Sequence, residues 1–328
     1  MTSGSPGRLI ILFAIPLMLG NICQQLYTMV DTMVVGQIAG VEALAALGAV
    51  DFLLWVVTGI STGLTQGFSI QLSQYYGAKD FENLRKSLAH SYRLTAFIAV
   101  GVFILSQSFA ALVLTGLHTP SNIIGMSLLY LRIIFCGIPA TAAYNMFAAA
   151  LRAMGNSKTP LTAMIIASVL NISLDILFVA GLGWGVAGAA IATVIAQSFS
   201  AVYCFLILRR IDIVHLSRAD FMTATGMTAR LMKLGIPVVF QNIIIGVGGL
   251  VVQYVINGYG FLFVAGFTAT NKLYGLLEMA AISYGYAIVT YVGQNLGAGR
   301  IDRIRKGVRS SMLLSLLTSL IISAAYVF

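Results

Sequence analysis

The chain contains an internal repeat, because two stretches about 220 residues apart are imperfect copies of one another. Each copy opens with an isoleucine-proline pair, Ile15-Pro16 in the first and Ile236-Pro237 in the second. Residues further on recur at an offset of 220: Gln74, Gly77, Ala78, Arg85, Lys86 and Ser91 become Gln294, Gly297, Ala298, Arg305, Lys306 and Ser311. In each copy, long apolar segments are followed by a glycine and a basic cluster. Such a repeat predicts a fold built from two similar lobes.

The composition of the chain is that of a membrane protein. Apolar residues make up 59% of the 328 residues and charged residues only 9%, whereas a soluble domain carries about a quarter charged residues. The net charge is +9, but the basic residues form short clusters between apolar runs, which indicates topology signals and no nucleic-acid partner. The three cysteines, Cys23, Cys136 and Cys204, stand singly and lack the spacing of a disulfide or metal site.

Apolar runs long enough to cross a membrane occur throughout the chain. A spanning helix needs about 20 apolar residues, because roughly 30 Å of hydrocarbon is crossed at about 1.5 Å per residue. The sequence therefore predicts an all-α polytopic membrane protein. About nine helices are expected, at residues 9–37, 44–76, 88–115, 122–151, 158–181, 184–208, 231–257, 262–296 and 308–328.

The basic residues predict the orientation of these helices. In a nine-helix arrangement, all the basic clusters between helices fall on one face, and the opposite loops contain no Lys or Arg. The positive-inside rule places the basic face and the N-terminus in the cytoplasm. Six helices separate the two copies, so the lobes are parallel: residues 1–215 form helices one to six, and residues 216–328 form helices seven to nine. We expect the second lobe to be incomplete here, with three further helices in the natural reading frame.

Polar residues form a line along the first predicted helix. Asn21, Gln24, Thr28 and Asp31 are spaced three, four and three residues apart, which places them on one helical face. A carboxyl group within a membrane must face a cavity or a partner, and it is a candidate proton or cation carrier. The alternative interpretation is a structural hydrogen bond between helices.

The fifth and sixth predicted helices carry similar polar residues. Ser168, Asn171 and Asp175 share one face of helix five, and helix six contributes Thr193 and Gln197. Two carboxylates with amide and hydroxyl oxygens are suited to bind Na⁺ or to share a proton. Spacing alone does not show that these helices meet, so separate polar contacts between packed helices remain the alternative.

Other polar and aromatic residues within the spans are weaker candidates. Arg132, Lys272 and Glu278 are intramembrane charges, each of which has a partner on another helix, snorkels to the membrane surface or contacts a substrate. Tyr27 belongs to a set of tyrosines suited to line a cavity for flat cations or to pack between helices. Pro16 interrupts the hydrogen bonding of helix one, so the helix has either a static kink or a hinge there.

The chain resembles the multidrug and toxic compound extrusion (MATE) transporters over essentially all its length. The resemblance is carried by five segments in a specific order: IPLMLGNICQQLYTMVDTMVVGQ at 15–37, QLSQYYGAKD at 71–80, LRAMGNSKTPL at 151–161, NISLDILF at 171–178 and GQNLGAGR at 293–300. It implies twelve helices in two six-helix lobes and a central cavity that opens alternately to each side. It also implies export of cationic or amphipathic drugs in exchange for H⁺ or Na⁺, with no other cofactor.

The resemblance is strongest to the DinF-like branch, which places a cation site in the first lobe. By that resemblance, Asp31, Asn171, Asp175 and Thr193 would bind H⁺ or Na⁺, and Pro16 would be the bending proline. The remaining candidates for the substrate cavity or hinge are Gln24, Tyr27, Thr28, Gln197, Lys272 and Glu278. The chain departs from members that use second-lobe carboxylates, because helix seven has no acidic residue. A monomer in the bacterial cytoplasmic (inner) membrane is expected.

Two other functions compete with drug export. A flippase for lipid-linked saccharides, from the same superfamily, would be expected to line its cavity with more basic residues for a pyrophosphate, whereas Arg132 and Lys272 are the only basic residues in the spans. A membrane-embedded enzyme is the second alternative. It is disfavoured because the sequence shows neither a metal-spaced cluster nor a nucleophile beside a base. We therefore expect no enzymatic activity.

Overall fold

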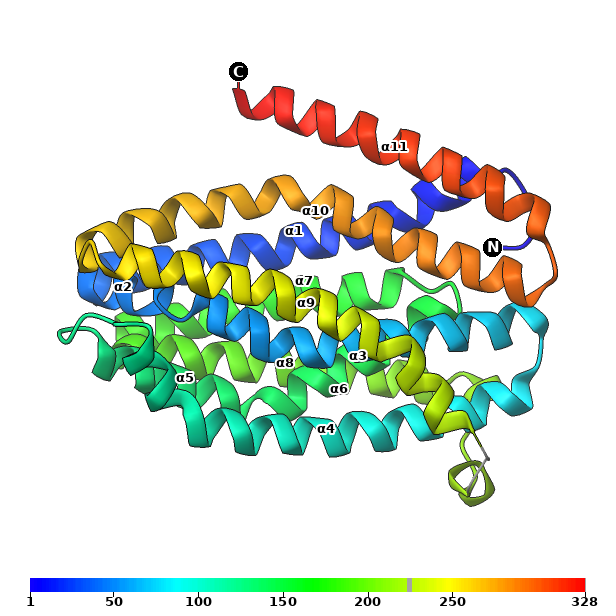
Figure 1. Ribbon diagram of the computed structural model, residues 1–328, viewed down its shortest axis with the longest axis horizontal. Helices are drawn as coiled ribbons and strands as arrows, with labels where there is room; N and C mark the ends of the chain where they lie inside the picture. The colour runs from blue at the N-terminus through cyan, green and yellow to red at the C-terminus, as the bar shows by residue number, and fades with distance from the viewer. Residues whose placement is uncertain (223–225, 328) are drawn as a thin grey trace.

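The computed structural model describes residues 1–222 and 226–327, except for the side chains of residues 272, 273, 276, 277 and 325–327. Every regular element of this part is helical, and the helices lie side by side along the long axis of the molecule (Figure 1). The α-helices are α1 (Pro6–Ile38), α2 (Val41–Gly48), α3 (Asp51–Ala78), α4 (Phe81–Gly116), α5 (Ile124–Cys136), α6 (Ile138–Ala153), α7 (Lys158–Asp175), α8 (Gly185–Arg209), α9 (Met227–Asn257), α10 (Phe261–Gly297) and α11 (Ile301–Val327). A π-helix, η1 (Ile176–Gly181), continues α7, and two short 3₁₀ helices, η2 (Asp212–Val214) and η3 (Arg218–Phe221), lie between α8 and α9.

The predicted all-α membrane fold is confirmed, but the predicted number of spans is slightly too high. The described residues contain seven helices that are long and apolar enough to cross a membrane, or eight if α5 and α6 form one span. Those two helices are bent by 48° at the break between them, where Pro139 at the start of α6 lacks the N–H that would continue the α5 ladder. The α10 backbone is helical throughout, and its first part, Phe261–Asn271, forms a shorter apolar segment before the undescribed side chains.

The turns between helices show why the two copies fold alike. Helix α3 ends at Lys79, which has a left-handed backbone with φ of 59°. The carboxylate of Asp80 then accepts the backbone N–H of Asn83 at 3.1 Å and caps α4. In the second copy, Gly299 at the position equivalent to Lys79 is also left-handed, with φ of 70°. Both copies therefore reverse direction through the same backbone conformation.

The first six predicted spans pack around one another, and α9 and α10 lie against them. One core cluster joins α3, α4, α6, α7 and α8 and extends to Met227 and Leu231 of α9. A second cluster joins α1 to α10 through side chains such as Phe13 and Tyr284. The helices contributed by the two copies are therefore in direct contact along α3–α9 and α1–α10.

Small residues allow α3 to approach the second copy very closely. A Cβ atom added to Gly63 of α3 would lie 2.8 Å from the backbone nitrogen of Val239 in α9. Near the ends of α3 and α10, the contact is reciprocal: a Cβ on Gly77 would meet the backbone of Gln294, and a Cβ on Gly297 would meet the backbone of Gln74. These four residues are the repeat-related pairs of the sequence, and we call this contact the glycine crossing. Backbones come this close only where side chains are absent.

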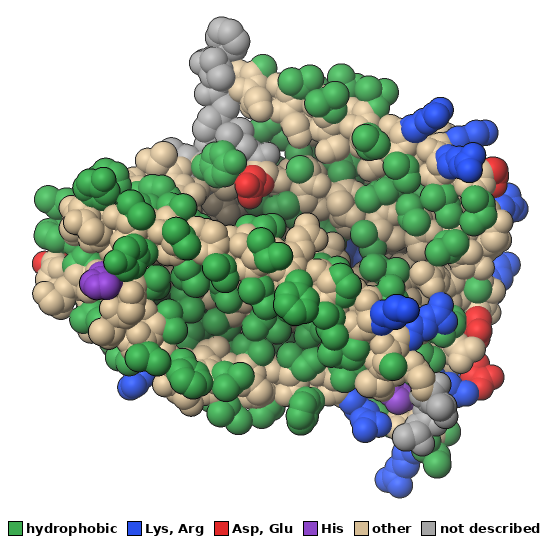
Figure 2. Space-filling view, in the orientation of Figure 1, with side chains coloured by type: hydrophobic (Ala, Val, Ile, Leu, Met, Phe, Trp, Pro, Cys, Tyr) green, Lys and Arg blue, Asp and Glu red, His purple; other side chains and the backbone are tan. Residues whose placement is uncertain are grey.

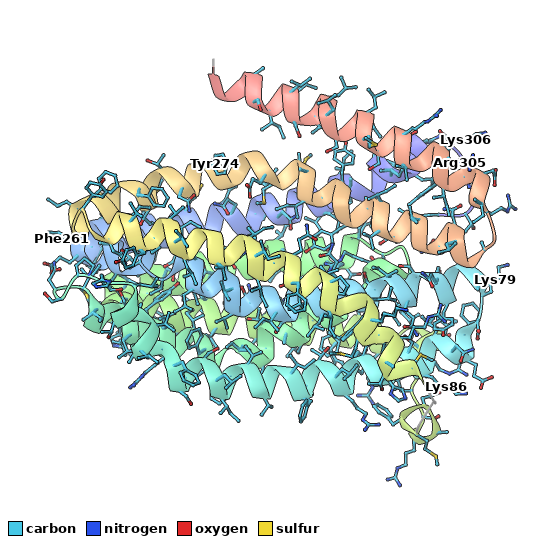
Figure 3. All side chains as sticks on the ribbon, in the orientation of Figure 1. Lys79, Lys86, Phe261, Tyr274, Arg305 and Lys306 are labelled. Atoms are coloured by element: carbon cyan, nitrogen blue, oxygen red, sulfur yellow. The ribbon has the colours of Figure 1, made fainter. Side chains whose placement is uncertain are left out.

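Charge and hydrophobicity are distributed as a membrane requires. Figure 2 shows that most Lys and Arg side chains visible on this face gather at one end of the molecule. Lys79, Lys86, Arg305 and Lys306 lie at this end, whereas Phe261 lies at the other (Figure 3). We call it the basic end. Large apolar side chains are exposed on the flanks of the bundle, including Phe97 at 80% exposure, as expected for a lipid-facing surface.

Candidate functional site

The four predicted cation-binding residues lie together between α1, α7 and α8. Asp31 of α1 and Asp175, the last residue of α7, are both buried, and their carboxyl groups are close enough to interact electrostatically. The amide nitrogen of Asn171 donates to the Thr193 hydroxyl at 3.5 Å, which links α7 to α8. We call these four residues the carboxyl site.

Asp175 is fully enclosed within the carboxyl site, as is Asn171. The residue is 0% exposed, and neither of its carboxyl oxygens has a hydrogen-bond partner among the described residues. The amide oxygen of Asn171, one helical turn earlier, is likewise buried without such a partner. The helix changes from α to π immediately after Asp175, a deviation that is frequent at functional sites. These oxygens are hard donors suited to a proton or to Na⁺.

Two tyrosines border the carboxyl site. The Tyr27 hydroxyl accepts a hydrogen bond from the amide of Gln197 in α8 at 3.1 Å, and Gln24 interacts with the same hydroxyl. Tyr130 of α5 is buried and close enough to Asp31 and Asp175 to interact electrostatically with both carboxyl groups. The sequence analysis did not identify Tyr130. A polar aromatic residue in an otherwise apolar stretch two residues before Arg132 was the available signal.

The polar residues predicted to share one face of α1 contact two different helices, α10 and α7. The Asn21 amide donates to Ser283 of α10 at 3.1 Å, whereas Asp31 faces α7. Asn21 and Asp31 are ten residues apart, which is about 2.8 turns of α-helix. Their side chains therefore point in different directions, although each pair of successive polar residues lies on nearly the same face. Thr28 donates to the backbone oxygen of Gln24 at 2.9 Å and is satisfied within α1. Pro16 lies inside α1, which remains helical on both sides of it; hinge motion there stays a prediction.

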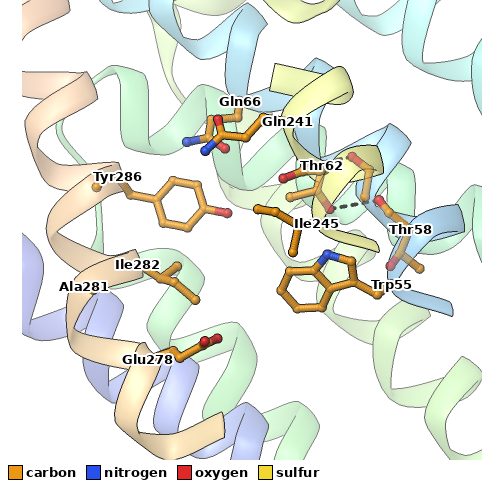
Figure 4. A pocket seen from close by; sticks show the side chains of 13 residues that line it. Trp55, Thr58, Thr62, Gln66, Gln241, Ile245, Glu278, Ala281, Ile282 and Tyr286 are labelled. Carbon is orange, nitrogen blue, oxygen red and sulfur yellow. Dashed lines mark hydrogen bonds between the residues drawn. The ribbon is translucent and has the colours of Figure 1, made fainter. Parts of the chain in front are cut away.

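A cavity of about 530 Å³ lies between α3, α9 and α10. Figure 4 shows Trp55, Thr62 and Gln66 of α3 facing Glu278 and Tyr286 of α10. A second cavity of about 300 Å³ shares Trp55, Ile245, Glu278 and Ile282 with the first and adds Gln25 and Asp51. We call the two together the central cavity.

The lining of the central cavity combines apolar, aromatic and uncharged polar side chains with few charges. Glu278 and Asp51 are the charged residues among the described lining side chains, which include no Lys or Arg. A cavity of this size with carboxylates and a Trp face is suited to amphipathic cations. Glu278 was predicted for this role. Trp55 and Asp51 were not, because nothing in the α3 sequence shows which of its faces meets α9 and α10.

Two other intramembrane charges were predicted, Lys272 and Arg132. The side chain of Lys272 lies outside the described residues. Arg132 is exposed, and its backbone oxygen accepts from the Gln107 amide at 2.9 Å. No group of three or more His, Cys, Asp or Glu suited to hold a metal occurs in the described part of the chain. The carboxyl site and the central cavity are therefore the two polar sites within the bundle that the sequence and the structure share.

Comparison with known proteins gives a consistent family assignment. The MatE family model matches residues 16–177 and 237–328. The probable multidrug resistance proteins YpnP and YoeA of Bacillus subtilis (strain 168) are 31% and 30% identical, and they cover 92% and 97% of this chain. The chain spans 68% of the first relative and 70% of the second.

Solved structures share the fold. An outward-facing multidrug resistance MATE family transporter of the MOP superfamily has a TM-score of 0.89 at 23% identity, covering 98% of this chain and 72% of that one. A MOP superfamily transporter from Pyrococcus furiosus has a TM-score of 0.87 at 24% identity, covering 99% of this chain and 71% of that one. The chain therefore belongs to the MatE family of multi-pass membrane transporters.

Proposed function

We propose that the protein is a secondary active multidrug exporter that exchanges cationic or amphipathic compounds for H⁺ or Na⁺. The carboxyl site is the observation that carries this proposal. Two buried carboxyls within electrostatic range disfavour being charged together, so a proton or Na⁺ stabilises them. The names of the relatives, probable multidrug resistance proteins, support drugs as the cargo.

The central cavity is the proposed drug site, and α1 connects it to the carboxyl site. Helix α1 carries Asp31, and it also contacts α10 through the Asn21–Ser283 hydrogen bond. Pro16 lies about 22 Å along the helix from Asp31 at 1.5 Å per residue. Binding of a cation at Asp31 and Asp175 would bend α1 near Pro16 and weaken drug binding. By linkage, a bound drug would weaken cation binding by the same factor.

Charge favours drugs over a lipid-linked pyrophosphate as the cargo. The described lining residues of the central cavity include Glu278 and Asp51 and no basic side chain. A pyrophosphate would need basic partners there, and the described lining residues supply none. We further propose that the protein acts as a monomer in the bacterial cytoplasmic membrane, with its N-terminus and basic end in the cytoplasm and with no enzymatic activity.

Efflux from proteoliposomes tests the proposal. A fluorescent cationic dye is loaded, and a pH gradient or a Na⁺ gradient is imposed in turn. We expect one gradient to drive efflux in the parent protein and efflux to be lost in Asp31→Asn and Asp175→Asn. The matched control is Asp302→Asn, which removes an exposed carboxylate at the start of α11.

Binding in detergent separates coupling from folding. Dye affinity should fall as pH is lowered or as Na⁺ is added, and this dependence should vanish in Asp175→Asn while the protein stays folded. Gradient-driven efflux that persists in both carboxyl variants would refute the carboxyl site as the coupling site. Absence of efflux under either gradient in the parent would refute antiport.

A further inference from the structure

A cavity of about 450 Å³ lies at the basic end, outside the central cavity and the carboxyl site. It is formed by α4, the end of α8 and the linker that follows α8. Its lining combines aromatic, apolar and basic side chains: Tyr92, Phe205, Leu208, Arg209, His215 and Phe221. The linker protrudes near Lys86 at this end of the molecule (Figures 1 and 3). No carboxylate is among the described residues that line this cavity.

Arg209 is the arginine among the described residues that line this cavity. Its side chain makes no hydrogen bond or ion pair with a described residue. Neighbouring arginines differ, because Arg85 pairs with Asp220 at 3.8 Å and Arg93 donates to the Phe221 backbone oxygen at 3.1 Å. His215 is held in place, since its Nε2 contacts the Arg209 backbone oxygen at 2.9 Å. A carbonyl oxygen only accepts, so Nε2 carries the hydrogen and a neutral ring leaves Nδ1 as an acceptor.

The cavity lies at the depth where lipid headgroups meet the protein. Tyr92 is eleven residues into α4, about 16 Å from its start, and α4 is about 54 Å long. A helix of that length exceeds a hydrocarbon layer of about 30 Å by about 24 Å, which is about 12 Å at each end when the excess is shared equally. Tyr92 and the end of α8 are therefore near the interface, where aromatic and basic side chains are typical.

An apolar track leads from this cavity toward the middle of the membrane. Val202, Phe205, Leu206 and Arg209 are spaced i, i+3, i+4 and i+7 along α8, so they share one face. The first three are exposed, at 57%, 38% and 50%. The face thus offers a charge at one end and an apolar surface beside it, which matches a lipid phosphate and its acyl chain.

We infer that this cavity binds an anionic phospholipid, with the phosphate against Arg209, a headgroup hydroxyl against His215, and an acyl chain along Val202, Phe205 and Leu206. The C-terminal dipole of α8 opposes an anion with about half a unit charge. The full charge of Arg209 outweighs it. The basic end thus has one specific lipid site in addition to its general attraction for anionic membranes.

Lipid binding to the purified full chain tests this inference. Phosphatidylglycerol is titrated in detergent and its binding is followed by native mass spectrometry, with phosphatidylcholine and glycerol 3-phosphate as separate arms. We expect phosphatidylglycerol to bind at least about tenfold more tightly than either, because a charge-assisted hydrogen bond and an apolar contact both contribute. Arg209→Gln should weaken binding about tenfold.

Two variants keep the result interpretable. Arg210→Gln removes the same charge from the same helix end, but Arg210 does not line the cavity, so binding should change less than about twofold. Arg209→Lys should restore part of the affinity in a folded protein. If Arg209→Gln and Arg210→Gln lowered the phosphatidylglycerol affinity equally, the binding would come from general electrostatic attraction, and the proposed site would be overturned. Equal binding of glycerol 3-phosphate would overturn the lipid, and equal binding of phosphatidylcholine would overturn the anion preference.

Discussion

The glycine crossing predicts that a single methyl group at Gly297 forces the two copies apart at the basic end. A Cβ there would lie 2.7 Å from the carbonyl carbon of Gln74, whereas ordinary contact begins near 3.4 Å. The neighbouring atoms belong to the backbone of α3, so no side chain can rotate away. The helices must separate by roughly 1 Å, because contact between carbon atoms is optimal at about 3.5–4.0 Å.

The energetic consequence can be estimated from packing. Adding a methyl group to a filled interface costs about 1–3 kcal/mol. If this free-energy cost applies only to molecules in which α3 and α10 touch, the ratio of molecules with an open basic end to molecules with a closed one rises by about 5- to 150-fold. Alanine also favours a helix over glycine by about 1 kcal/mol. Gly101→Ala shares that gain and is the matched control, because nothing lies within 4 Å of its added Cβ.

Thiol labelling measures this population. Cys23, Cys136 and Cys204 are replaced by alanine, and a single cysteine is introduced at Gln66 in the central cavity. A membrane-impermeant maleimide is then applied to vesicles that expose the basic end. We expect labelling in Gly297→Ala to be several-fold faster than in the parent, and the repeat-related Gly77→Ala to behave alike.

If Gly297→Ala labels at the same rate as the parent and as Gly101→Ala, and unfolds at the same temperature, the crossing is not a tight contact. A lower unfolding temperature without faster labelling would show that the crossing stabilises the fold without controlling access.

Three further substitutions have specific expected effects. Glu278→Gln should weaken binding of a monovalent cationic dye to the central cavity about tenfold, because a charge–charge attraction is lost. Binding of a neutral dye should stay unchanged. Equal weakening of both dyes in a binding titration would contradict this expectation. Tyr27→Phe removes the acceptor for the Gln197 amide and should destabilise the protein by about 1–3 kcal/mol in detergent unfolding, an effect that Gln197→Leu in the same protein should largely relieve. Asn257→Leu breaks a buried 2.8 Å hydrogen bond to the Leu117 backbone oxygen and should cost about 2 kcal/mol, which a thermal melt comparable to that of the parent would disprove.

Helix positions could be predicted from the sequence because hydrophobic run length is a local property. The expected helix at 158–181 corresponds to α7 with η1, and the expected helix at 231–257 lies within α9. The break between α5 and α6 was missed, since an apolar run of the right length does not show a bend. Pro139, two residues after Gly137, was the local signal for this bend. The π-helix after Asp175 has no comparable signal in residue spacing.

The carboxyl site was only partly predictable. Spacing placed Asn171 and Asp175 on one face, but it did not show that Asp31 lies beside them, because contacts between helices depend on packing across the whole bundle. The resemblance to a known family supplied that step. Tyr130 and the α3 face of the central cavity stayed hidden for the same reason, since neither residue type nor period distinguishes a face that meets lipid from one that meets another helix.

The separation between the carboxyl site and the central cavity bears on how such a protein acquires new cargo. Among the described residues, the two sites share helix α1 but no lining residue, since the cavity is lined from α1 by Gln25 and the carboxyl site uses Asp31. If the proposed function holds, substitutions at Trp55 or Ile245 reshape the proposed drug site while the proposed coupling carboxyls of Asp31 and Asp175 stay unchanged. An exporter arranged in this way would change the range of compounds that it binds by single substitutions, without any change at its cation site.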